Sequence, residues 1–197
     1  MNRIVLASKS PTRSAILANA GVAFETMPSR VDERQVEAPL VAAGASPAEV
    51  ALALAEAKAM DVAINAGNAL VIGSDQTLDA DGERWDKPET MDAARGQLLS
   101  LAGRSHQLHT AVAGVRDGAI RWRHVESATL TLRSLSQAEV DRYLAKVGEA
   151  ALGSVGAYQI EGPGIQLFDH IDGDYFAILG LPLLPVLHWL REEGGLG

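Results

Sequence analysis

Three groups of polar side chains in this sequence have the types and spacing needed to handle a phosphate group. They are the segment 8–13 (Ser-Lys-Ser-Pro-Thr-Arg), the acidic pair at 32–33 (Asp-Glu), and Asp75, which follows an apolar run. Hydroxyl and cationic groups bind phosphate oxygens, and carboxylate oxygens are the ligands that Mg²⁺ prefers. Together these groups are typical of chemistry on a phosphate compound.

The segment 8–13 predicts an anion-binding turn between a strand and a helix. Ser10-Pro11 has the form of an N-cap followed by proline at the first helical position. A helix N-terminus offers unpaired N–H groups and the positive end of the helix dipole. Ser8 and Ser10 add hydroxyl donors, and Lys9 and Arg13 add charge, which suits a phosphate. A plain helix cap with Lys9 and Arg13 both facing solvent is the alternative that these residues leave open.

Asp75 follows residues 69–73, which predict a buried strand of an α/β sheet. An aspartate at the carboxyl end of such a strand lies where open sheets bind ligands. Gly73 and Ser74 carry little side chain, so a ligand could approach the backbone closely. A capping or turn role is the alternative for an isolated aspartate of this kind.

Further charged residues could converge on Asp75. Asp32 and Glu33 could bind Mg²⁺ together with it, although an exposed acidic turn is the alternative. Lys58 lies in an alanine-rich segment, and Lys87 is held extended because it precedes a proline. Both lysines also fit solvated surface positions. The sequence therefore predicts a candidate site of cationic and acidic side chains, and it leaves a surface position open for each of them.

The elements that must position these residues alternate between helix and strand. Helices are predicted over 11–19, 48–66, 90–101, 136–146 and 181–193, and strands over 3–7, 24–28, 69–73, 107–116 and 120–132. Residues 79–82 (Asp-Ala-Asp-Gly) predict a hairpin turn, with a phosphatase nucleophile at Asp79 as the alternative. This interleaving indicates an α/β fold with a mixed sheet.

Composition narrows the class of protein. The 197 residues suffice for one domain, and the net charge of −8 argues against a nucleic-acid partner. The absence of cysteine excludes disulfides, thiolate catalysis and cysteine-bound zinc, and the five histidines have no zinc spacing and are interpreted as structural. No apolar segment reaches the length of a membrane span, and we expect a cytoplasmic protein without a membrane partner.

Several short motifs occur in an order that resembles the Maf family, the Maf-like nucleoside triphosphate pyrophosphatases. The match extends from residue 3 to about residue 190. The motifs are Leu6-Ala-Ser-x-Ser-Pro-x-Arg13, Val31-Asp-Glu33, Ile72-Gly-Ser-Asp75, Lys87-Pro88, Gly103-Arg-x-His106 with Thr110, Gly156-Ala-Tyr158, Gly162 and Gly180-Leu-Pro182.

The resemblance implies an elongated α/β fold similar to the inosine triphosphatases. It implies one domain over residues 1–197, with a mixed sheet flanked by helices, two lobes around a central cleft, and a homodimer; we expect 194–197 to be a flexible tail. It also implies hydrolysis of a nucleoside triphosphate to the monophosphate and pyrophosphate, dependent on Mg²⁺ or Mn²⁺. Asp75 matches the catalytic carboxylate of the family, and its phosphate- and metal-handling positions are matched by Ser8, Arg13, Glu33, Lys58 and Lys87.

Three positions bear on the base of the substrate. Where the pyrimidine-acting branch of the family typically has Arg, Thr and Gln, this chain has Thr12, Gln76 and Glu161. Gln76 and Glu161 are similar to the branch acting on 7-methyl-GTP, whereas Thr12 departs from both branches. A carboxylate suits that base, because methylated guanine is cationic and presents N–H donors.

The sequence thus favours a 7-methyl-GTP pyrophosphatase. A dTTP/UTP pyrophosphatase of the same family is the first alternative. A regulator of cell division that binds a nucleotide without hydrolysing it is the second. A phosphatase acting through Asp79 and Asp81 is the third.

Overall fold

The structure is a computed structural model that describes residues 2–196, and it divides the chain into two compact units. Unit 1 comprises the residues up to Gln76, His109–Ser127 and the residues from Asp174 onward. Unit 2 comprises Thr77–Leu108 and Ala128–Gly173. Seven strands form one sheet in the order β2-β1-β3-β5-β6-β7, with β4 paired to β3. The predicted α/β class with a mixed sheet is confirmed.

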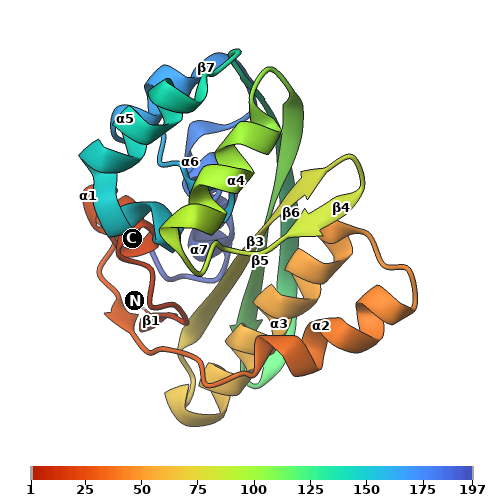
Figure 1. Ribbon diagram of the computed structural model, residues 1–197. Helices are drawn as coiled ribbons and strands as arrows, with labels where there is room; N and C mark the ends of the chain where they lie inside the picture. Colours follow the sequence, from red (N-terminus) through yellow and green to blue (C-terminus); the bar gives the residue numbers. More distant parts are fainter. Residues whose placement is uncertain (1, 197) are drawn as a thin grey trace. The chain divides into compact units, whose positions relative to one another are not determined.

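Unit 1 holds the parallel strands β1 and β2, the first part of β3 and the longest helix, α3 (Figure 1). Strand β1 pairs in parallel with both β2 and β3. Three strands, β3, β5 and β6, contribute residues to both units. The elements of this unit are β1 (Ile4–Leu6), α1 (Pro11–Asn19), β2 (Glu25–Thr26), α2 (Glu33–Ala42), α3 (Pro47–Ala66), β3 (Leu70–Ala80, first part), β5 (Ser105–Arg116, second part), β6 (Ala119–Leu132, first part), α6 (Tyr175–Ile178) and α7 (Leu183–Glu192).

Strand β1 and the first part of β3 are apolar on both faces, as strands covered by helices on each side must be. One face, with Leu6 and Ile72, packs against α1 and α7. The opposite face, with Val71, packs against the small side chains of α3. That helix is rich in alanine, so it lies close to the sheet, and it begins at the capping box formed by Ser46 and Glu49.

Unit 2 combines the remaining strand segments with short helices. Helix α4 packs against α5 and against two short 3₁₀ helices. The predicted hairpin turn is confirmed, because β3 and β4 pair antiparallel and Asp79 Oδ1 accepts a hydrogen bond from the Gly82 N–H at 2.7 Å. The elements of this unit are β4 (Glu83–Trp85), α4 (Met91–Leu101), α5 (Gln137–Val147), η1 (Gly148–Gly153), η2 (Val155–Ala157), η3 (Pro163–Leu167) and β7 (Phe168–Asp172).

Strand β3 is longer than predicted. The prediction ended it at residue 73, whereas it continues to Ala80, with Thr77 and Leu78 buried. The polar residues 74–77 do not end the strand, because β3 lies between β1 and β5 in the sheet and continues to Ala80, where it pairs with β4. Asp75 therefore lies in the middle of a strand rather than at its carboxyl end, which corrects the sequence interpretation.

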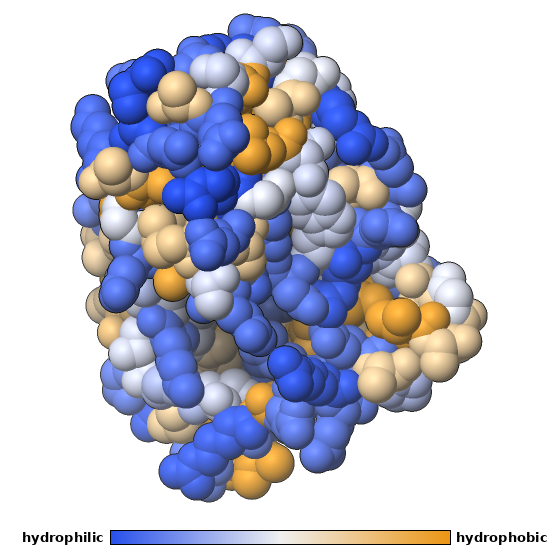
Figure 2. Space-filling view, in the orientation of Figure 1, coloured by the Kyte–Doolittle hydropathy of each residue, from blue (hydrophilic) through white to orange (hydrophobic). Residues whose placement is uncertain are grey.

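The last described residues pack against unit 1. The Gly195 N–H donates to the Leu190 carbonyl at 2.7 Å, and Leu196 contacts the apolar cluster around α7. The flexible tail over 194–197 stays a prediction, and residue 197 lies outside the described residues. Apolar side chains on the face in Figure 2 form small groups among hydrophilic ones. Across residues 2–196, every helix is too short or too polar to span a membrane.

Candidate active site

Strand β3 carries four consecutive polar residues in its central part, of which Ser74, Asp75 and Gln76 come first. Successive side chains of a strand point to opposite faces. Asp75 shares the face of Val71, which is covered by α3, whereas Ser74 and Gln76 share the face of Ile72. The strand therefore presents a carboxylate to one side and two neutral polar groups to the other.

Helix α3 approaches β3 closely at Gly73. A Cβ atom placed there would lie 2.2 Å from the Ala55 carbonyl oxygen and 2.7 Å from the Ala59 backbone nitrogen. Only glycine fits such a contact. The sequence interpretation reserved this space for a ligand, but the structure fills it with the backbone of α3. Gly73 thereby brings α3, and Lys58 on it, against the strand that carries Asp75.

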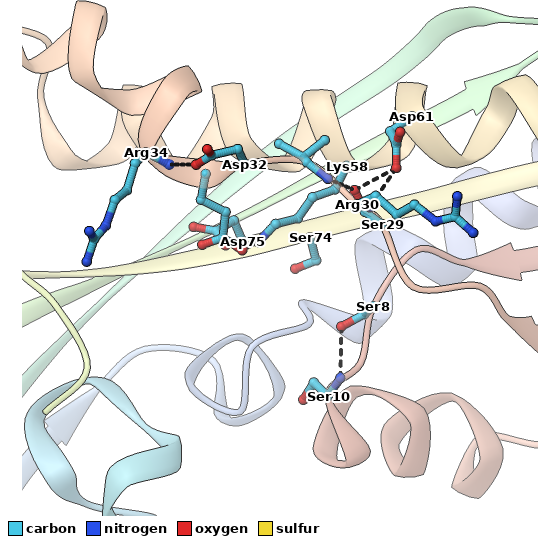
Figure 3. A network of polar contacts seen from close by, with 12 residues as sticks. Ser8, Ser10, Ser29, Arg30, Asp32, Arg34, Lys58, Asp61, Ser74 and Asp75 are labelled. Atoms are coloured by element: carbon cyan, nitrogen blue, oxygen red, sulfur yellow. Dashed lines mark hydrogen bonds and ion pairs between the residues drawn. The ribbon is translucent and has the colours of Figure 1, made fainter. Parts of the chain in front are cut away.

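Lys58 joins two carboxylates of the predicted site. Its Nζ donates to Asp75 Oδ1 at 2.6 Å and lies 2.8 Å from Glu33 Oε1. Lys58 and Asp75 are labelled in Figure 3. Asp75 is 8% exposed, so burial raises the pKa of its carboxyl group, and the charges of Lys58 and Arg13 partly oppose that rise. Glu33, Lys58 and Asp75 therefore lie in contact with one another through Lys58, as the sequence predicted.

Asp61, which was not predicted from the sequence, holds the loop that precedes Glu33. It lies one turn beyond Lys58 on α3, and its Oδ2 accepts from Ser29 Oγ at 2.9 Å and from the Arg30 N–H at 2.8 Å (Figure 3). This holds the loop that leads into α2. The signal available in the sequence was the spacing of three between two charged residues in an alanine-rich helix, which places both on one side.

The two residues of the acidic pair at 32–33 make different contacts. Asp32 is the N-cap of α2, and its Oδ1 accepts from the Arg34 N–H at 3.1 Å. Its Oδ1 therefore serves as the cap of this helix, and a part for Asp32 in a metal site stays a prediction. Glu33, the first residue of α2, is the member that reaches Lys58.

The segment 8–13 has the predicted cap geometry. Ser10 is the N-cap of α1 and accepts from the Arg13 N–H, while Ser8 Oγ accepts from the Ser10 N–H at 3.1 Å. Each hydroxyl thus accepts from the protein and keeps its own O–H to donate to a ligand. Ser8 is 8% exposed and Lys9 is exposed. Thr12 lies on the first turn of α1.

Arg13 points into the protein rather than into solvent. Its Nε donates to the Gly180 carbonyl at 2.7 Å and its Nη1 to the Ser74 carbonyl at 2.9 Å. Burial lowers the pKa of Arg13, and the negative charges of Asp75 and Glu33 oppose that effect. The guanidinium therefore supplies positive charge near Asp75 and ties the adjoining backbone of β3 to the turn at Gly180.

Gln76 and Thr110 form a second polar group on the other face of the strand. Gln76 Nε2 donates to Thr110 Oγ1 at 2.7 Å and lies 3.1 Å and 3.0 Å from the carbonyl oxygens of Ala177 and Ile178. Thr110 Oγ1 donates to the Ala177 carbonyl at 2.8 Å. This group fixes the turn that follows α6.

Two predicted site residues belong to unit 2. Lys87 is exposed between β4 and α4, and Glu161 is exposed in the turn before η3. Burial raises the pKa of Tyr143 on α5, and the negative charge of Glu161 adds to that rise. In unit 1 the structure joins Ser8 and Ser10 to Arg13, and it joins Glu33 and Asp75 to Lys58. Gln76 points to the opposite face of β3 from Asp75 and contacts Thr110 instead.

A divalent cation would have Glu33 and Asp75 as its protein ligands in unit 1. Among residues 2–196, no three histidine, aspartate or glutamate side chains are grouped closely enough to enclose a metal. The two carboxylates lie around one Lys58 ammonium group, so they already share one cation. This set fits Mg²⁺, which is bound through one or two carboxylates with waters and substrate phosphates completing its shell.

Comparison with known proteins gives consistent matches along the chain. The model of the family described as "Maf-like protein" matches residues 3–193. The chain is 58% identical to the 7-methyl-GTP pyrophosphatase of Rhizobium meliloti (strain 1021), over 98% of this chain and 97% of that protein. It is 56% identical to the protein of the same name from Brucella abortus biovar 1 (strain 9-941), over 97% of this chain and 96% of that protein.

Two further similarities complete the comparison. The chain is 51% identical to the nucleoside triphosphate pyrophosphatase of Caulobacter vibrioides, over 98% of this chain and 96% of that protein. A crystal structure of a nucleoside-triphosphatase, dITP/XTP pyrophosphatase, from Mycobacterium abscessus has a TM-score of 0.42 and 16% identity, covering 98% of this chain and 95% of that one. From the family match and the identities above 50%, the chain belongs to the Maf-like protein family.

Proposed function

We propose that this protein is a nucleoside triphosphate pyrophosphatase with 7-methyl-GTP as its preferred substrate. The observation that carries the proposal is the group of Lys58, Asp75 and Glu33, in which a buried carboxylate is held by an ammonium group at 2.6 Å. The names of the relatives from Rhizobium meliloti and Caulobacter vibrioides support the same activity.

In the proposed reaction, a water molecule attacks the α-phosphorus of the nucleotide. The bond from that phosphorus to the oxygen bridging to the β-phosphate breaks, and pyrophosphate leaves. Asp75 accepts a proton from the water or orients it, and its raised pKa favours the transfer. Lys58 and Arg13 stabilise the negative charge that develops on the phosphoryl oxygens. The hydroxyl protons of Ser8 and Ser10 bind the phosphate chain.

We include a divalent cation, Mg²⁺ or Mn²⁺, in the proposal. Glu33 and Asp75 would hold it, and Lys58 would then give up part of its contact with them. When bound, the ion would polarise the phosphoryl oxygens and neutralise their charge. Exposed Lys87 is proposed to bind the phosphates as well.

The first test is Asp75→Asn, with pyrophosphate and free phosphate measured separately in the presence of Mg²⁺. The variant should lose at least about a thousandfold in kcat, because the amide neither accepts the proton nor pairs with Lys58 in the same way. Asp79→Asn is the matched control, since its amide oxygen can still accept from the Gly82 N–H, and it should keep its activity.

The products decide between the proposal and its alternatives. Release of free phosphate that depends on Asp79 would favour a phosphatase. Binding of nucleotide without release of any product would favour a regulator. Pyrophosphate release by Asp75→Asn at the wild-type rate would contradict the assignment of Asp75.

Preference for 7-methyl-GTP is proposed to depend on Thr12, Gln76 and Glu161. A panel of nucleotides that includes 7-methyl-GTP, GTP, dTTP and UTP tests it by comparing kcat/KM. Glu161→Gln should lose activity toward 7-methyl-GTP more than toward the pyrimidines, because a neutral amide no longer attracts the cationic base. An unchanged profile would contradict the role of Glu161.

The remaining parts of the proposal concern the state of the protein. We propose a homodimer that acts in the cytoplasm on a small nucleotide and has no nucleic-acid partner. Light scattering on the purified protein measures the oligomeric state. A nucleic-acid binding assay at low salt checks the last point, since the net charge of −8 disfavours such binding.

A further inference from the structure

The carboxamide of Gln76 is surrounded by acceptors on its nitrogen side. Nε2 has Thr110 Oγ1 at 2.7 Å and the carbonyl oxygens of Ile178 and Ala177 at 3.0 Å and 3.1 Å. A backbone carbonyl can only accept, so turning the amide over would place its oxygen against two oxygens. The orientation is therefore fixed, with Nε2 toward the protein.

The amide oxygen is the group that this arrangement leaves for a ligand. Across residues 2–196, the hydrogen bonds of the Gln76 side chain all use its nitrogen, and the side chain is partly exposed. A free glutamine can offer a donor or an acceptor. In this fold Gln76 can offer an acceptor alone.

Thr110 completes the arrangement from the neighbouring strand β5. It is 1% exposed, and its single hydroxyl proton goes to the Ala177 carbonyl at 2.8 Å. Its oxygen is therefore left with lone pairs toward Gln76 and accepts from Nε2. The direction of one buried hydrogen bond thus sets the direction of the next.

The two carbonyls set which end of the amide faces the protein, and Thr110 makes the shortest contact with it. We propose that Thr110 is a positioning residue for substrate selection, which holds the Gln76 amide where its oxygen accepts from an N–H donor on the edge of the nucleobase. The inference rests on the proposed function and deepens it. Guanine presents N1–H and N2–H donors on one edge, whereas thymine and uracil present a single N–H between two carbonyls. An amide locked as an acceptor matches the first pattern and repels the carbonyls of the second.

The test is Thr110→Val, which keeps the shape of the side chain and removes the hydroxyl. Both substrates are assayed by pyrophosphate release, and the measured quantity is kcat/KM for 7-methyl-GTP divided by kcat/KM for dTTP. We expect this ratio to fall about fivefold, the factor that one neutral hydrogen bond is worth. Thr110→Ser keeps the hydroxyl and should hold the ratio within about twofold of wild type.

A double-mutant cycle separates positioning from a merely structural role. In a Gln76→Ala background, Thr110→Val should leave the ratio unchanged, because the residue it positions is gone. An equal loss toward both substrates, or the same change of ratio in both backgrounds, would overturn the proposal. If Thr110→Val is unfolded at the assay temperature, Thr110→Ala carries the same comparison without an added methyl group.

The wild-type protein provides the check on the proposed function itself. If it releases no pyrophosphate from any nucleotide of the panel, the proposed function fails. If it does so and the ratio is insensitive to Thr110→Val, the function stands and the role of Thr110 is refuted.

Discussion

Replacing Gly73 with alanine should damage the site without touching any of its polar groups. The added Cβ would lie 2.2 Å from the Ala55 carbonyl oxygen and 2.8 Å from the Ala59 Cβ, where ordinary contacts are about 3.5 Å. The backbone of α3 has to retreat by roughly 1 Å to make room. Overpacking of this kind costs about 1–3 kcal/mol of unfolding free energy.

The same displacement acts on the reaction through Lys58. This residue lies one turn beyond Ala55 on α3, and its Nζ is held 2.6 Å from Asp75. A shift of about 1 Å in a positioned group can cost up to about a hundredfold in rate. We therefore expect Gly73→Ala to lose between about ten- and a hundredfold in kcat, while the protein remains folded at 25 °C.

The assays are urea unfolding and pyrophosphate release on the same preparation. Gly96→Ala is the matched control, because Gly96 is exposed on α4 and its added Cβ would meet no atom within 4 Å. This control should gain up to about 1 kcal/mol from helix propensity and keep its activity. Wild-type stability and wild-type kcat in Gly73→Ala would refute the argument.

Two further predictions concern Asp61 and His106. Asp61→Ala should lower kcat by roughly tenfold, because the loop leading to Glu33 loses two hydrogen bonds to a charged acceptor. Asp61→Asn keeps an acceptor oxygen and should lower kcat by less. Equal losses of kcat in the two variants would contradict this. Burial lowers the pKa of His106 to about 4 from 6.5, so below pH 6.5 the unfolded chain takes up a proton that the folded protein excludes. Stability should be independent of His106 above that range and fall by about 3 kcal/mol as the pH drops from 6.5 to 4. Urea midpoints for wild type and His106→Asn check it, and an equal acid dependence of both would refute it.

The sequence predicts the acidic centre of the site well, because the relevant signals are local. Ser10 followed by proline identifies a helix start, and an apolar run ending at a carboxylate identifies a strand with a polar residue. Both features are determined by neighbours in the chain. The cap of α1 is accordingly found where it was expected, and β3 begins within one residue of the predicted start.

The partners of these residues depend on contacts between distant segments, and sequence patterns do not contain them. The length of β3 is decided by pairing with other strands, so its end is misjudged by seven residues at Ala80. Gly73 is small because of Ala55, eighteen positions earlier, and not because of a ligand. The role of Asp61 follows from Ser29, thirty-two positions away.

The alternation of Ser74, Asp75 and Gln76 along one strand has a consequence for the diversity of this family. The carboxylate faces α3, while Gln76 turns to the other face with Thr110. Under the proposed function, Asp75 serves the chemistry and Gln76 serves recognition of the base, although the two residues are adjacent in the sequence. Under the proposed function, a library randomised at Gln76 and Thr110 should yield enzymes of altered nucleotide preference that keep an intact reaction centre. On this proposal, substitutions at Gln76 and Thr110 can change the substrate preference while Asp75 and Lys58 on the other face of the strand stay as they are.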